Sequence, residues 1–296
     1  MLNFKTPELD DREAVQKIVE KTRNMGNDLS FANLFLLRKK YDTKICFDNG
    51  FLLRTYNGPY NRVGYAFPLG KGDIEKEILI LKQYAENKGE KLQFCFLSEK
   101  QKNLLCETYK DEYEFSFDEG DCDYIYKTQK LADLVGNKYH KHKNKCLKFE
   151  KTYENIRACK IDEKNIEDAY KVEEMWLSEH SEDKMIIIER DAIKEALANM
   201  DALELFGLII YVDETPVAMS IASQINHNTC DIHFEKSYGE FADNGAYSFI
   251  CREMAKNLVM YKYLNREEDL NMEGLRQSKM SYHPTQKYKK FLARSK

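Results

Sequence analysis

The sequence predicts a mixed α+β protein in which one order of helices and strands occurs twice. Amphipathic segments with apolar residues three or four positions apart alternate with short apolar runs that are typical of strands. Tight-turn signals such as Asp48-Asn49-Gly50 separate neighbouring strands. A hairpin, a long helix and a further strand follow one another in each half of the chain. No residue identity is visible between the halves, so the duplication rests on the order of elements alone.

The first half is expected to open with two helices, because Ser30 can cap a helix whose apolar residues begin at Phe31. A hairpin follows at Asp48-Asn49-Gly50, and Gly89 can end the long amphipathic helix after it. The expected helices of this half are 10–21, 30–41, 73–88 and 98–109. The expected strands are 44–48, 51–56, 62–67, 91–97 and 122–127.

The second half is expected to contain a buried strand at 205–212 and two further strands joined by polar turns. The expected helices are 164–178, 189–199, 246–260 and 273–280, and the expected strands are 205–212, 217–225, 229–235 and 261–265. Three parts follow from this order: a first domain over 1–130, a basic connecting helix over 131–152, and a second domain over 153–296 that carries the candidate active site.

Composition limits the class of protein. The chain has 296 residues, 43% of them apolar, which is enough for one large or two ordinary domains. Its net charge of −4 argues against a general nucleic-acid binder. The eight cysteines are widely spaced and show no zinc-finger pattern, so reduced core cysteines are expected and no metal is predicted. Without a secretory leader or a long apolar run, we expect a cytoplasmic protein with no transmembrane segment.

The strand 229–235 carries the first candidate catalytic groups. Its alternation places Asp231, His233 and Glu235 on one face and apolar residues on the other. Either His233 or Glu235 could take a proton from an attacking acceptor. The alternative is a half-exposed strand whose polar face is simply solvated.

The terminal segment supplies a second set of charged groups. Glu267, Glu268 and Asp269, beside Arg266, could bind the ammonium group of an amino-acid substrate. The alternative is an exposed loop, in which an internal ion pair contributes little.

A cationic pair follows this loop. Arg276 and Lys279 are three residues apart and share a helix face, where a guanidinium or an ammonium could stabilise an oxyanion. The alternative is a basic tail packed on its own acidic neighbours.

Two further features concern phosphate-bearing partners. The segment 136–151 carries six lysines and a single acid, so Lys138, Lys141, Lys143 and Lys145 could contact an RNA backbone or an anionic lipid surface. The alternative is a solvated connecting helix.

Gly245 and Ala246 begin a helix where a CoA pyrophosphate could bind, although Asp243 nearby would repel it.

Several stretches resemble the DUF2156 family, which is similar to the cytoplasmic C-terminal domain of phosphatidylglycerol lysyltransferases. The matching residues are Ser30–Leu34, Phe67–Gly70, Asp123–Tyr126, Lys138–Asn144, Phe234–Lys236 and the terminal motif Asn265–Asp269 with Gly274–Tyr282. The resemblance implies two tandem acetyltransferase-like (GNAT) folds with mixed, mostly antiparallel sheets, as in Fem-type peptidyltransferases. It also implies aminoacyl transfer from charged tRNA, and it adds Tyr282 to the candidate substrate site.

Three functions follow as hypotheses. The first is an aminoacyltransferase that moves an amino acid from aminoacyl-tRNA to a lipid headgroup, a peptide or a small molecule. The second is an N-acyltransferase on the same fold that uses acetyl-CoA or another acyl-CoA. The third is a non-catalytic module that binds RNA or an anionic membrane through 136–151 and the basic tail.

Overall fold

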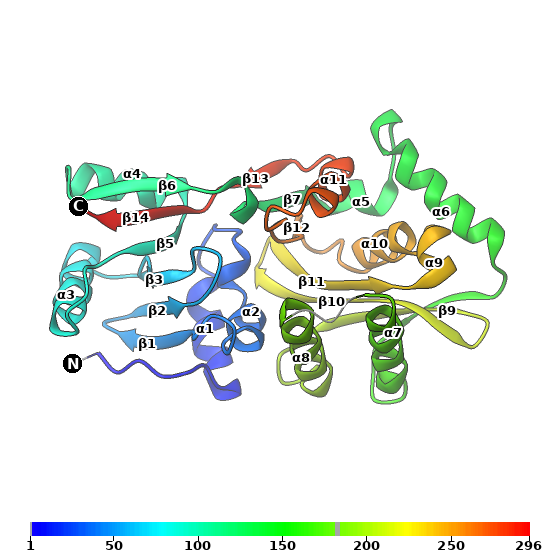
Figure 1. The fold of residues 1–296 in the computed structure, drawn as a ribbon, viewed down its shortest axis with the longest axis horizontal. Coiled ribbons are helices and arrows are strands. Elements are labelled where there is room, and N and C mark those ends of the chain that lie inside the picture. The colour runs from blue at the N-terminus through cyan, green and yellow to red at the C-terminus, as the bar shows by residue number, and fades with distance from the viewer. Residues whose placement is uncertain (1, 181–183) are drawn as a thin grey trace. The chain divides into compact units, whose positions relative to one another are not determined.

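The structure, a computed structural model, describes residues 2–180 and 184–296 and divides into two compact units (Figure 1). One unit comprises Met1–Asp123, Glu268–Glu273 and Lys287–Lys296, and the other comprises Tyr124–Glu267 and Gly274–Gln286. We call them the first and the second unit. Each has a seven-stranded mixed sheet with helices packed on it, so the predicted mixed α+β class is confirmed.

The sheet of the first unit has the order β1-β2-β3-β5-β14-β6, and β4 pairs with β2. Its strands are β1 (Lys44–Asp48), β2 (Phe51–Asn57), β3 (Val63–Ala66), β4 (Leu69–Gly70), β5 (Phe94–Leu97), β6 (Tyr113–Phe117) and β14 (Phe291–Ser295). Its helices are α1 (Arg12–Val19), α2 (Phe31–Leu36), α3 (Ile74–Asn87) and α4 (Glu99–Thr108). Ser30 caps α2 by accepting a hydrogen bond from the amide of Asn33, as expected.

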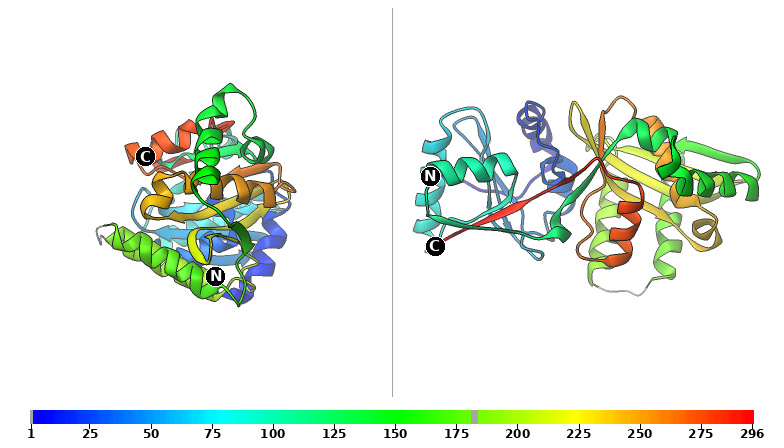
Figure 2. Two further views of the ribbon diagram at one scale, coloured as in Figure 1. Left: turned by 90° about the vertical axis from the view of Figure 1, so that its right-hand side faces the viewer. Right: turned by 90° about the horizontal axis from the view of Figure 1, so that it is seen from above.

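The sheet of the second unit has the order β13-β7-β12-β11-β10-β9-β8. Its strands are β7 (Asp123–Lys127), β8 (Ile156–Lys160), β9 (Phe206–Val212), β10 (Thr215–Asn226), β11 (Thr229–Ser237), β12 (Tyr263–Asn265) and β13 (Gln286–Tyr288). Its helices are α5 (Thr128–Asp133), α6 (His140–Thr152), α7 (Ile166–Ser178), α8 (Lys184–Ala198), α9 (Gly239–Asp243), α10 (Ala246–Asn257) and α11 (Glu273–Ser281). The helices α7 and α8 lie on one side of the sheet, and α10 lies on the other with α5 and α6 (Figures 1 and 2).

The two units do not follow the predicted contiguous domains. The strand β7, expected to close the first domain, pairs with β12 in the sheet of the second unit. The last strand, β14, lies in the basic tail and inserts between β5 and β6 of the first unit. Local periodicity identifies a strand but carries no information on which sheet it joins, so this exchange was not predictable from the sequence pattern.

The helix α6 differs from the expected connecting helix over 131–152. Its buried residues His142, Cys146 and Phe149 pack in the core of the second unit, so α6 is a structural layer of that unit with one exposed basic side. Among the described residues, no helix combines the length and the apolar character that a membrane crossing requires.

Candidate active site

The candidate site lies where two parallel strands of the second unit separate. The strand β11 pairs with β12 only from Thr229 to Asp231, whereas its pairing with β10 continues to Ser237. Because β12 ends at Asn265, the chain that follows it carries Arg266 and Glu267 beside the remaining edge of β11.

A bulge in β11 sets which side chains meet at this edge. Ile232 lies opposite Ala222 and Phe234 lies opposite Ile221, so His233 is an extra residue without a partner on β10. An extra residue reverses the alternation of side chains beyond it. The predicted single polar face of Asp231, His233 and Glu235 is therefore wrong, and so is the alternative of a solvated face. The side chains of these residues are only 0%, 3% and 13% exposed.

Glu235 forms a buried ion pair with Arg266. The Arg266 Nε donates to Glu235 Oε2 at 3.0 Å, and Nη2 donates to the same oxygen. The guanidinium carbon lies 4.6 Å from the centre of the Tyr282 ring. The third nitrogen, Nη1, is buried and has no hydrogen-bond partner among the described residues. A buried donor without a partner is costly, so Nη1 marks a position where an acceptor group of a ligand is favoured.

Tyr282 is held by a chain of hydrogen bonds that runs through His142. Ser281 Oγ donates to a backbone carbonyl, so it accepts from His142 Nε2 at 2.9 Å. His142 Nδ1 then accepts from Ser248 Oγ at 3.1 Å, which in turn accepts from the Tyr282 hydroxyl at 3.2 Å. The imidazole also stacks on the Tyr282 ring, with ring centres 3.5 Å apart.

Burial lowers the pKa of His142 to about 4, because desolvation and then Lys145 and Arg266 disfavour its charged form. The ring is therefore neutral near pH 7 and fixes Tyr282 in place without adding charge beside Arg266. His142 was not among the predicted site residues. Its place in a buried stripe with Tyr139, Cys146 and Phe149 was a signal for burial. The matching stretch Lys138–Asn144 also contains it, but nothing in that stretch singled it out.

Lys279 lies on α11 and is almost fully buried, with 8% exposure. Its backbone carbonyl accepts a hydrogen bond from the Tyr126 hydroxyl at 2.7 Å, and the Arg266 guanidinium lies 5.8 Å from the Tyr126 ring. It is thus the backbone of Lys279 that contacts Tyr126, whereas its ammonium group lies 5.9 Å from the centre of the Tyr124 ring. Arg276, on the same helix, is half-buried.

A second cluster surrounds His233. Its Nε2 lies 2.8 Å from Ser223 Oγ, and its Nδ1 lies 3.3 Å from Glu267 Oε1 and 3.6 Å from Asp231 Oδ2. Glu267 follows Arg266 in the chain, so neighbouring residues of the segment after β12 contribute to the two groups. Ser223 was not predicted, and its position within an apolar strand gave no signal.

The other two carboxylates of the terminal motif belong to the first unit. Glu268 forms ion pairs with Arg62 and Lys290 and accepts a hydrogen bond from the Asn27 side chain at 2.9 Å. Asp269 is fully buried. The chain turns at Glu267, whose φ of 54° is in the left-handed region. Glu268 therefore serves a buried structural network, and Asp269 accepts a hydrogen bond from the Asn271 amide at 2.8 Å, so we drop both from the candidate substrate site. The basic tail contributes Lys290 to that network, whereas Lys289, Arg294 and Lys296 of the tail are exposed.

The predicted RNA-contacting lysines are all exposed. Lys141 and Lys145, four residues apart on α6, share one side of the helix, and Lys138 lies one turn before them. Lys143 lies on a different side of α6 by the same periodicity. Three of the four predicted lysines therefore form a short basic row.

The glycine expected at a CoA site has a packing role. Gly245 has φ of +109°, and a Cβ atom there would lie 2.4 Å from the carbonyl oxygen of Lys145. The glycine thus allows α6 to approach the start of α10, and Ala246 is buried in the same core. This packing accounts for the glycine without a cofactor.

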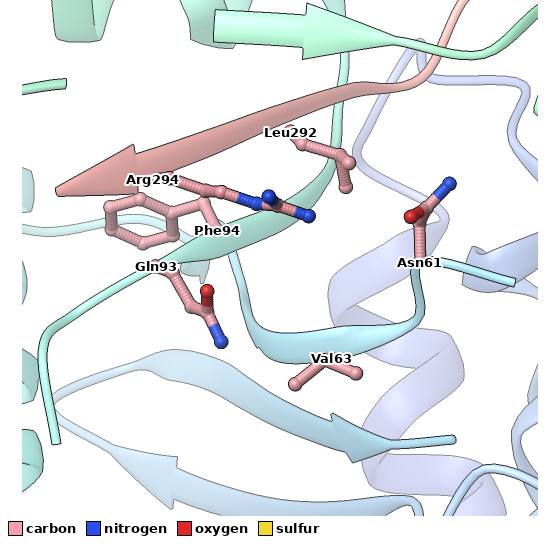
Figure 3. Close-up of a pocket in the computed structure, with 6 residues that line it drawn as sticks. All are labelled: Asn61, Val63, Gln93, Phe94, Leu292 and Arg294. Carbon is pink, nitrogen blue, oxygen red and sulfur yellow. The ribbon is translucent and has the colours of Figure 1, made fainter. Parts of the chain in front are cut away.

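A surface pocket of about 170 Å³ lies in the first unit (Figure 3). Its lining residues are Asn61, Val63, Gln93, Phe94, Leu292 and Arg294. None of them belongs to the predicted site, and we assign this pocket no chemistry.

Comparisons with known proteins agree with this architecture. A family model described as phosphatidylglycerol lysyltransferase, C-terminal, matches residues 20–294. A conserved protein of unknown function from Bacteroides thetaiotaomicron is 31% identical over all of both chains, with a TM-score of 0.94. L-PGS from Bacillus licheniformis is 16% identical and covers 98% of this chain and 93% of its own, with a TM-score of 0.66. FemX is 9% identical and covers 98% and 96%, with a TM-score of 0.62. No curated protein matches the chain.

These likenesses show the fold. The predicted mixed sheets in two parts of the chain are confirmed, and so is the resemblance to the DUF2156 family.

Proposed function

The chain belongs to the family of phosphatidylglycerol lysyltransferase C-terminal domains, and we propose that it is an aminoacyltransferase that takes its amino acid from aminoacyl-tRNA. The acceptor in this proposal is a hydroxyl or amine of a lipid headgroup, a peptide or a small molecule. The observation that carries it is the buried Glu235–Arg266 pair with its unpartnered Nη1, at the edge where β11 and β12 separate.

Aminoacyl transfer has three chemical requirements that the protein must meet. The acceptor must lose a proton as it attacks the ester carbonyl, the resulting oxyanion must be stabilised, and the ribose oxygen must leave with a proton. We assign the proton of the acceptor to Glu235, because both bonds from Arg266 go to Oε2 and leave Oε1 to accept it. His233, the other candidate base, already has a partner at each ring nitrogen.

Cations and acids near this pair complete the assignment. Arg266 Nη1, with Lys279 or Arg276, stabilises the oxyanion, and the fixed position of Arg266 on Tyr282 limits reorganisation. Glu267 is the carboxylate of the terminal motif that we assign to the ammonium group of the aminoacyl moiety. The exposed row of Lys138, Lys141 and Lys145 contacts tRNA phosphates, with Lys143 a weaker candidate.

A transfer assay tests the proposal. The purified protein is incubated with each radiolabelled aminoacyl-tRNA in turn, together with phosphatidylglycerol vesicles, small peptides or small hydroxyl compounds, and labelled products are separated and identified by mass spectrometry. We expect one donor and one acceptor class to give product. We expect Glu235→Gln to lower the rate by about 10²–10⁴-fold, as removal of a general base does.

Two controls sharpen this result. Glu214→Gln removes an exposed carboxylate from the turn before β10 and should leave the rate unchanged. If no aminoacyl-tRNA loses its amino acid faster than by spontaneous hydrolysis, the proposal fails. If acetyl-CoA instead gives an acetylated product, the acyl-CoA alternative replaces it.

The tRNA-binding row has a separate test. Binding should weaken steeply with salt, and the log–log slope should fall by about 0.7–0.9 for each phosphate that the protein no longer neutralises. Charge reversal of Lys141 and Lys145 should reduce that slope, whereas the same change at the exposed Lys76 and Lys100 should not. Equal effects of both pairs would mean that only the net charge matters. Binding by a catalytically silent protein would support the third hypothesis, a non-catalytic module.

A further inference from the structure

Three possible metal-ligand atoms converge at the end of the β11–β12 pair. One oxygen each of Asp231 and Glu267 and one ring nitrogen of His233 all lie within 4.8 Å of one another. The Asp231 and His233 side chains are 0% and 3% exposed, and that of Glu267 is 22% exposed. The group is therefore built into the end of the β11–β12 pair and has one side open to small solutes.

The spacing of these atoms fits an ion better than a shared proton. A charge-assisted bond from a protonated imidazole to a carboxylate is about 2.7–2.9 Å long. His233 Nδ1 lies 3.3 Å from Glu267 Oε1 and 3.6 Å from Asp231 Oδ2, so both separations are longer than that. Ligands bound to a metal at about 2.0–2.2 Å with tetrahedral or octahedral angles are separated by about 3.0–3.5 Å. The distances from His233 Nδ1 to the two carboxylates lie close to this range.

The imidazole is oriented for such a role. Its Nε2 lies 2.8 Å from Ser223 Oγ, an interaction in which Nε2 can donate its proton. The proton on Nε2 leaves a lone pair on Nδ1, which faces the two carboxylates. A hydrogen bond from the second ring nitrogen to a fixed acceptor is the usual way in which proteins orient a metal-binding histidine.

We propose that Asp231, His233 and Glu267 bind one divalent transition-metal ion, with Zn²⁺ as the best match. An imidazole nitrogen with carboxylate oxygens suits Zn²⁺ more than Mg²⁺ or Ca²⁺, which prefer oxygen ligands alone. The two carboxylates balance the charge of the ion. Three protein ligands leave a further coordination position for water or a substrate oxygen, as in catalytic zinc sites. This inference does not depend on aminoacyl transfer, and it replaces the assignment of Glu267 to the substrate ammonium group with a role as a metal ligand.

Metal binding can be measured without any activity. The intact chain is treated with a chelator, dialysed, and titrated with Zn²⁺ by calorimetry, and bound metal is counted by elemental analysis. We expect one tight site per chain, a rise in the thermal unfolding temperature, and visible absorption when Co²⁺ replaces Zn²⁺. The exposed Cys106 is changed to serine in every sample, because a free thiol also binds zinc.

Matched variants identify the ligands. Glu267→Gln and His233→Ala should abolish the tight site and the Co²⁺ absorption. Ser223→Ala should weaken binding by about tenfold or more, as removal of an orienting partner does. His227→Ala and Glu214→Gln change exposed residues of the same types and should bind as the unchanged chain does. If His233→Ala does not fold, metal binding by Glu267→Gln tests the proposal instead, since Glu267 is the most exposed of the three ligands and its replacement disturbs the fold least.

Two results overturn the proposal: absence of a tight site in the unchanged chain, or equal binding by Glu267→Gln and Glu214→Gln. Tight binding without aminoacyl transfer would sustain the metal site and count against the proposed function. Aminoacyl transfer by a chain that binds no metal would support the proposed function and overturn the metal site. Failure of the metal site and failure of the proposed function are therefore distinguishable.

Discussion

The pair of Glu235 and Arg266 allows a quantitative test of how the site is stabilised. Arg266→Met removes the guanidinium and leaves the Glu235 carboxylate, only 13% exposed, without its counter-charge. Removing one member of a buried ion pair typically costs about 3–5 kcal/mol of unfolding free energy, because the remaining charge is neither solvated nor paired. Removing the cation–π interaction of the guanidinium with the Tyr282 ring adds about 0.5–1 kcal/mol.

The double variant separates charge from packing. Replacing both partners with apolar residues, as in Glu235→Leu with Arg266→Met, leaves no isolated charge, and such replacements are often nearly neutral. We therefore expect each single variant to lose about 3 kcal/mol or more and the double variant to lose much less than the sum. The exposed pair of Arg157 and Glu214, with side chains 48% and 93% exposed, is the control, and Arg157→Met should cost less than about 1 kcal/mol.

Urea unfolding followed by tryptophan fluorescence measures these differences. Trp176 is the only tryptophan of the chain and lies on α7, so its signal reports on the unit that contains the pair. Single variants that each cost less than about 1 kcal/mol, with effects that simply add in the double variant, would refute a buried, mutually dependent pair.

Three further predictions concern buried groups and backbone. Burial raises the pKa of Glu173 to about 7, so between about pH 4.5 and 7 the native state holds a proton that the unfolded chain has lost, and stability should fall as the pH rises through this range. In denaturation at several pH values, Glu173→Gln should be more stable than the unchanged chain by up to about 3 kcal/mol above about pH 8. Burial lowers the pKa of His142 to about 4, so stability should fall as pH drops from about 6.5 to 4, and NMR of the imidazole should show no protonation above pH 5 or so. Gly245→Ala should lower the unfolding free energy by more than about 2 kcal/mol, because φ is +109° and the new Cβ meets the Lys145 carbonyl. In the same measurement, the control Gly89→Ala should lower it by about 1 kcal/mol, because φ is +74° but no atom lies within 4 Å of the new Cβ.

Local sequence patterns predicted most elements because the forces involved act over a few residues. The hairpin of β1 and β2 forms at Asn49 and Gly50, both with positive φ, where the turn signal placed it. The amphipathic helix expected at 73–88 is observed as Ile74–Asn87. The sequence patterns missed the strands β6, β8 and β14 and the short strands β4 and β13. Among these, β8 is largely exposed and β14 lies within a basic tail. Their place in the sheets is decided by partners far away in the chain.

The candidate site was harder to predict because it depends on two irregularities. A period of two assigned Asp231, His233 and Glu235 to one face, but the bulge at His233 brings Glu235 to Arg266 and leaves His233 with Ser223 and Glu267. Bulges leave little trace in a single sequence, since they require no special residue at most positions. Four charged residues in a row also suggested one substrate-binding loop, whereas the turn at Glu267 divides them between two networks.

The backbone around Arg266 explains why the terminal motif is contiguous in sequence. The Arg266 amide donates to the Tyr124 carbonyl at 3.0 Å, and the Tyr124 amide donates to the Glu267 carbonyl at 3.2 Å. The side chain of the fully buried Asn265 accepts from the Glu267 amide at 2.7 Å. Arg266 is therefore fixed by β7 on one side and by its own neighbour on the other before any ligand binds. A charged group held in this way stabilises a developing oxyanion without reorganising, which a lysine or arginine on a free loop cannot do. The value of Asn265-Arg266-Glu267 thus lies in rigid placement: one residue anchors the turn, the next presents the cation, and the third supplies the carboxylate beside His233.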